Sequence, residues 1–167
     1  MRTALLVFLR WLHTIALALW LGGLIAIGAL VAPAAFHVVR VSPAFAGNLG
    51  LQNNIAGGIV GSSLHSFTAV CFACGFLLLF VNGILLREAG RQWTFCLLAV
   101  SLALLLSVFY LGFALTPAME QAQNLGNSPL FDQLHHRYEM ISIDFQFPLL
   151  LLTAFLSALR DTRHERV

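Results

Sequence analysis

"LLVFLRWLHTIALALWLGGLIAIGALVA", residues 5–32, decides the fold, because an apolar run of this length predicts a transmembrane helix. A helix crosses the hydrocarbon core of a bilayer with about 20 apolar residues, at a rise of roughly 1.5 Å each. Three later stretches also qualify, near residues 64–86, 93–115 and 140–159. All four are too long for the strands of a membrane β-barrel, which need about 9–11 residues. The sequence therefore predicts an all-α integral membrane protein, a four-helix bundle.

The composition supports a single membrane domain over residues 1–167. The chain is 59% hydrophobic and 10% charged, whereas soluble domains carry roughly 25% charged residues. The four spans use most of the chain, and we expect the last helix to extend outward from about residue 131. The nine arginines are scattered and form no basic patch. The expected partner is therefore the lipid bilayer, and nucleic acid is not expected.

The arginines predict how the chain is oriented, because cytoplasmic segments of membrane proteins carry an excess of positive charge. Seven of the nine fall at the termini and in the second connection: Arg2, Arg10, Arg87, Arg91, Arg160, Arg163 and Arg166. The other two, Arg40 and Arg137, lie opposite. We therefore expect an inner (plasma) membrane protein with both termini cytoplasmic. A long outer connection over residues 33–63 would then cover the bundle or re-enter its mouth.

Small residues in the spans favour close packing between helices. We expect helix contacts at Gly22, Gly23, Gly28, Gly57 and Gly61. Cys71 and Cys74 form a C-x-x-C inside an apolar helix, where cysteine behaves as a small buried hydrophobe. The sequence contains no hydrolase, phosphate-binding or zinc-protease motif, so it gives no support to an enzyme of these kinds.

Four histidines fall on the outer side of the predicted bundle: His37, His65, His135 and His136. If they converge at the outer mouth, their neutral imidazoles suit haem iron or copper. Asp132 precedes His136 by four residues, one helical turn, and its carboxylate could orient that imidazole. A haem b or copper site is one interpretation. The other is that these histidines are interfacial or form hydrogen bonds between helices.

Asp144 lies inside an apolar run, where a charge costs roughly 2.5–3.5 kcal/mol at a helix centre. We therefore expect it to face the bundle. Arg137, seven residues earlier, would lie on the same helix face, so a structural ion pair is one explanation. A coupling group of a small-solute transporter is another, although helix three has few polar residues between Ser101 and Ser107.

Four stretches in series resemble the TMEM205-like (DUF4149) family of four-helix membrane proteins. They are "LWLGGLIAIGALVAPAAF" at 19–36, "AGGIVGSSL" at 56–64, "LTPAME" at 115–120 and "FDQLHHR" at 131–137. The resemblance implies the same four-helix fold and assigns no catalytic residue.

His13, followed by Trp20, Gly22 and Gly23, is more loosely similar to copper-resistance D proteins and haem-containing protoporphyrinogen oxidases. Those oxidases are expected to use a lysine beside the histidine, and this chain has no lysine.

These observations favour a non-enzymatic membrane protein that acts as an accessory or scaffold subunit, with a redox or energy-converting complex as one setting. Its protein partners would be other membrane subunits or further copies of the chain. A haem- or copper-binding protein is the alternative, and a small-solute transporter is the third hypothesis.

Overall fold

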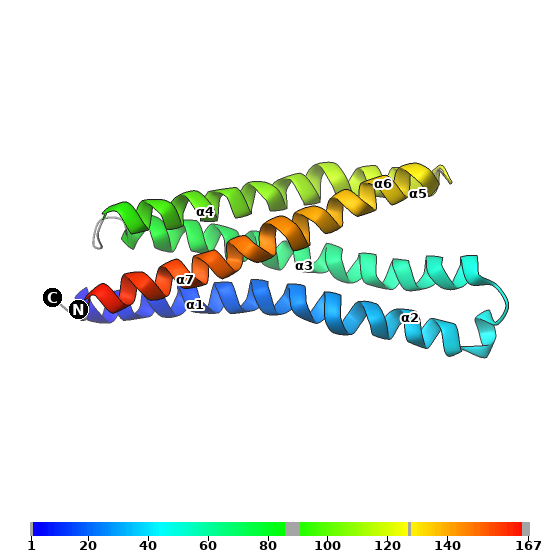
Figure 1. Ribbon diagram of the computed structural model, residues 1–167, viewed down its shortest axis with the longest axis horizontal. Helices are drawn as coiled ribbons and strands as arrows, with labels where there is room; N and C mark the ends of the chain where they lie inside the picture. The colour runs from blue at the N-terminus through cyan, green and yellow to red at the C-terminus, as the bar shows by residue number, and fades with distance from the viewer. Residues whose placement is uncertain (1, 86–90, 127, 165–167) are drawn as a thin grey trace.

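A computed structural model of the chain describes residues 2–85, 91–126 and 128–164. Within these ranges the regular secondary structure is entirely helical. Four long helices run back and forth, so that the first helix begins and the last helix ends at the same end of the molecule (Figure 1). All four are long and apolar enough to cross a membrane: Thr3–Val41, Leu49–Leu85, Trp93–Asn124 and Ser128–Leu159. The prediction of an all-helical, multi-pass membrane protein is confirmed.

Three of the four long helices change winding partway along. The first contains α1 (Arg2–Ala26), the π-helical η1 (Ile27–Val31) and α2 (Ala32–Val41). The second is α3 (Leu49–Leu85), and the third contains α4 (Arg91–Tyr110), the π-helical η3 (Leu111–Leu115) and α5 (Thr116–Asn124). The fourth contains α6 (Ser128–Glu139), the π-helical η4 (Met140–Gln146) and α7 (Phe147–His164).

The expectation of a long connection over residues 33–63 is wrong. α2 continues to Val41, a short 3₁₀ turn, η2, covers Pro43–Phe45, and α3 begins at Leu49. Pro33 does not end the first helix, because it lies in the first turn of α2, directly after a π-helical turn. Proline lacks an N–H and clashes with the preceding helical turn, and the wider winding of a π turn relieves this conflict.

The same combination recurs twice. η3 ends two residues before Pro117 and η4 ends two residues before Pro148. Beside Pro117, the Thr116 hydroxyl donates a hydrogen bond of 2.8 Å to the carbonyl of Leu111. The proline positions therefore mark changes of winding within continuous helices.

The long helices exceed the thickness of a bilayer. α3 has 37 residues and is about 55 Å long at 1.5 Å per residue, whereas the hydrocarbon core is about 30 Å thick. We name the extensions opposite the termini the distal arms: α2 with residues 49–63 of α3, and α5 with α6. Within each arm the two helices pack together, and the arms diverge from one another (Figure 1).

The core lies between the helices in their shared, membrane-spanning part. Trp20, Leu78, Leu104 and Leu150, one from each long helix, are fully buried in it. A Cβ on Gly75 would lie 2.8 Å from the side chain of Leu105, so this glycine allows α3 and α4 to approach closely.

The predicted glycine contacts are confirmed at one position of five. A Cβ on Gly23 would overlap the ring of Phe67. At the other four positions an added Cβ would meet none of the described atoms within 4 Å: Gly22, Gly28, Gly57 and Gly61. These four glycines lie on exposed faces, so packing within the bundle does not require their small size.

Candidate functional site

The predicted histidine cluster does not form a ligand group. His37, His65 and His136 are exposed on α2, α3 and α6, and His135 is half-buried. In the described part of the chain, no three His, Cys, Asp or Glu side chains lie close enough together to hold a metal ion. His13 is buried in α1, about 36 Å along the helix from His37 at 1.5 Å per residue.

On α6, the carboxylate beside a histidine belongs to Glu139, which was not predicted as a site residue. Nε2 of His135 lies 3.3 Å from Oε1 of Glu139, one turn later. The imidazole also stacks on Phe131, with ring centroids 5.9 Å apart. Asp132, the predicted partner of His136, is exposed. These contacts give His135 a defined position on the surface of the second distal arm.

Asp144 is exposed, so the expectation that it faces the bundle is wrong. The buried residues of this segment are Ser142 and Gln146, and a residue two positions from each lies on the opposite side of a helix. Arg137 is exposed too. In the segments that the structure covers, no ion pair joins it to Asp144. The π turns of η4 between them hold more residues than α turns, so the two no longer share a face.

Buried polar contacts instead join the helices at two serines of α4. Nε2 of Gln146 donates a hydrogen bond of 2.9 Å to Oγ of Ser107, which donates to the carbonyl of Leu104. Likewise, Nδ2 of Asn82 donates 3.0 Å to Oγ of Ser101, which donates to the carbonyl of Leu97.

The serine bonds fix the orientation of both carboxamides. Each serine hydrogen is committed to a backbone carbonyl, so the serine can only accept from the carboxamide. The NH₂ group of Gln146 must therefore face Ser107, and its amide oxygen must point away from it. The same holds for Asn82, whose buried Oδ1 has no hydrogen-bond partner in the described structure.

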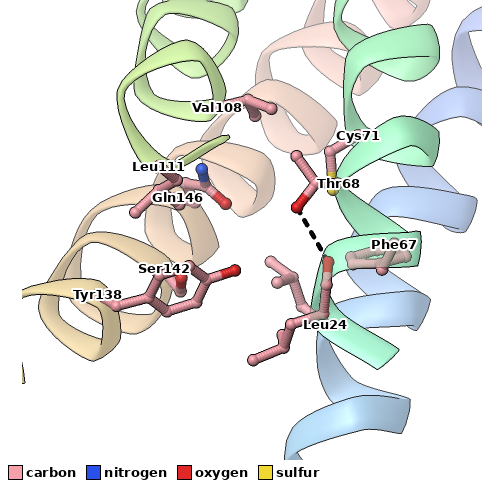
Figure 2. A pocket seen from close by; sticks show the side chains of 10 residues that line it. Leu24, Phe67, Thr68, Cys71, Val108, Leu111, Tyr138, Ser142 and Gln146 are labelled. Atoms are coloured by element: carbon pink, nitrogen blue, oxygen red, sulfur yellow. Dashed lines mark hydrogen bonds between the residues drawn. The ribbon is translucent and has the colours of Figure 1, made fainter. Parts of the chain in front are cut away.

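The amide oxygen of Gln146 points toward a small pocket at the base of the distal arms (Figure 2). Each long helix contributes to its lining: Leu24, Leu64, Phe67, Thr68, Cys71, Val108, Leu111, Tyr138, Ser142 and Gln146. The cavity volume is about 10 Å³, and a water molecule needs roughly 10–15 Å³ on this measure. The pocket can therefore hold one oxygen-sized group.

Polar atoms from two sides converge on this pocket. The Tyr138 hydroxyl points into the pocket from the side of the fourth long helix, and Ser142 also lines it there (Figure 2). Thr68 donates its own hydrogen to the carbonyl of Leu64 over 2.9 Å, so its oxygen is left to accept. None of the lining side chains is an acid, an arginine or a histidine. The pocket is thus an uncharged hydrogen-bonding site within apolar walls.

This site was not predicted from the sequence, although the sequence contains one signal for it. Tyr138, Ser142 and Gln146 are spaced four apart, which places three polar side chains on one face of an otherwise apolar helix. Ser107 was treated as evidence of a shortage of polar groups in helix three, yet it binds Gln146 across the helix interface.

The fold and this site define a multi-pass membrane protein of four helices. The chain belongs to the family described as Domain of unknown function (DUF4149), whose model matches residues 15–128. The match includes the pocket residues of the first three long helices, and Tyr138, Ser142 and Gln146 lie after it. Neither the curated proteins nor the solved structures contain a match to this chain.

Proposed function

We propose that the protein is a non-enzymatic accessory or scaffold subunit of a larger membrane complex, and that its distal arms bind the partner subunit. The observation that carries this proposal is the apolar surface of the arms. Both extend beyond the hydrocarbon thickness that the spans require, and both expose large apolar side chains. These are Val38, Val41, Leu49, Ile59, Leu125 and Leu130.

Lipid tails cannot cover the apolar side chains of arms that extend beyond the hydrocarbon core, so these side chains need another partner. Fully burying a Val or Leu side chain is worth about 1.5–3 kcal/mol relative to leaving it in water. Several large apolar side chains exposed outside the hydrocarbon therefore favour a protein interaction site. A partner that covers these residues would gain this free energy without any change in the membrane-spanning core.

The proposal includes an orientation. In the inner membrane, with both termini cytoplasmic, the arms would project from the outer surface. The arginine bias of the sequence supports this side, because seven of the nine arginines fall at the termini and in the second connection. No observation on the described residues favours the haem, copper or transporter hypotheses over a scaffold.

A matched pair of valines tests the proposal. Val38 on α2 and Val7 on α1 are both 62% exposed, but Val7 lies near the termini, at the opposite end from the arms. We expect Val38→Ser to reduce recovery of the native complex after purification in mild detergent, and Val7→Ser to leave it unchanged. Equal recovery of the complex from both variants, with both chains folded, would contradict the role of the arms.

A further inference from the structure

The pocket at the base of the arms has a defined pattern of hydrogen-bond acceptors. The Gln146 amide oxygen is turned toward it, because the NH₂ group is held by Ser107. The Thr68 oxygen accepts there, because its hydrogen is bonded to Leu64. A group bound between these two oxygens must therefore donate a hydrogen bond.

The same group must also be able to accept a hydrogen bond and must be uncharged. The hydroxyls of Tyr138 and Ser142 belong to the pocket lining, and a hydroxyl can donate one hydrogen bond (Figure 2). A carboxylate, phosphate or ammonium group would be desolvated without a counter-charge, because no charged side chain lines the pocket. A single hydroxyl satisfies all these requirements, and its oxygen fits the volume of about 10 Å³.

We infer that this pocket binds the hydroxyl head of a neutral, long-chain membrane alcohol. Its lining residues fall at the distal limit of the predicted spans, with Leu64 at the start of one and Leu111 near the end of another. This is the depth at which an amphiphile places a polar head, while its chain remains in the surrounding leaflet. A lone water molecule offers the same hydroxyl chemistry, and the experiment separates the two. The inference is independent of the proposed scaffold function.

Photolabelling of the full chain in phosphatidylcholine vesicles tests the inference. The probe is a primary C16 alcohol with a diazirine close to its hydroxyl end, and the control probe is its methyl ether. The ether cannot donate a hydrogen bond, so we expect it to label residues 64–71 about fivefold more weakly, as expected for one hydrogen bond. Excess unlabelled hexadecanol should remove the label given by the alcohol.

Two threonines provide matched variants. Thr68 lines the pocket, whereas Thr153 is buried elsewhere and donates the same kind of bond to the carbonyl of Leu149. Thr68→Val should reduce labelling by the alcohol about fivefold, and Thr153→Val should not. If Thr68→Val does not fold, Tyr138→Phe carries the same expectation of weaker labelling. Equal labelling by alcohol and ether, or no labelling of this segment because it holds water alone, would overturn the inference.

Discussion

The hydrogen bond between Asn82 and Ser101 allows the effect of a substitution on the free energy of unfolding to be predicted. Asn82 is fully buried, Nδ2 is bonded to Ser101, and Oδ1 has no partner in the described structure. Ser101→Ala would leave the whole carboxamide without a partner inside the bundle. An unsatisfied buried donor costs about 1–3 kcal/mol, and side-chain hydrogen bonds within membranes reach about 1.7 kcal/mol. We expect Ser101→Ala to lower the free energy of unfolding by about 1–2 kcal/mol.

Asn82→Leu should cost less, although it removes the same hydrogen bond. Leucine has a similar size and no polar atoms, so the unpartnered Oδ1 disappears together with Nδ2. Ser101 keeps its bond to the carbonyl of Leu97 and remains satisfied. Replacing both partners by apolar groups is often nearly neutral, so Ser101→Ala in the Asn82→Leu background should cost less than about 0.5 kcal/mol.

A double-mutant cycle measures this difference. It compares the unsubstituted protein, the two single variants and the double variant. Each is unfolded reversibly in mixed micelles with increasing dodecyl sulfate, and unfolding is followed by fluorescence transfer between labelled helices. The expected coupling between the two sites is about 1 kcal/mol. If Ser101→Ala cost the same amount in both backgrounds, the assignment of the contact would be refuted.

Three further predictions follow from the packing and the orientation. Gly75→Ala should destabilise the bundle by about 1–3 kcal/mol, because the new Cβ would lie 2.8 Å from Cδ1 of Leu105. In the same unfolding assay, Gly61→Ala should be neutral or slightly stabilising. Ser107→Ala should lower the free energy of unfolding more than Gln146→Leu, since only the alanine variant leaves a buried carboxamide without its hydrogen-bond partner. Equal losses of stability in the two variants would contradict this. Alkaline phosphatase fused after Leu125 should be active in a bacterial host, and the same enzyme fused at the C-terminus should be inactive; the reverse pattern would refute the orientation.

The membrane-spanning helices were predictable because length and apolarity alone identify them. Most of the distal arms was not, because the first and third spans were expected to end near residues 32 and 115, just before Pro33 and Pro117. A sequence does not show that a π turn will precede each proline and let the helix continue. The less apolar sequence of α5 lay outside the predicted spans, since nothing in its composition requires a membrane. Most of α6, in contrast, was expected as the outward extension of the last helix from about residue 131.

The histidine site was predicted from the chemistry of its residues alone. The four histidines were chosen because imidazole binds metals, but which of them meet depends on how the helices are rotated about their axes. Serine, glutamine and asparagine are unremarkable in a sequence until a partner helix faces them. Gln146 became a site residue only once the structure placed it against Ser107, 39 positions earlier.

The most direct test of the scaffold function is photo-crosslinking in native membranes. A photoreactive phenylalanine analogue would replace Leu49 or Leu125, each 72% exposed on a distal arm, and Phe80, 63% exposed on the membrane-spanning part of α3. We expect a protein adduct of one defined mass from both arm positions and lipid adducts alone from Phe80. Arm positions that give no protein adduct, or the same products as Phe80, would contradict it.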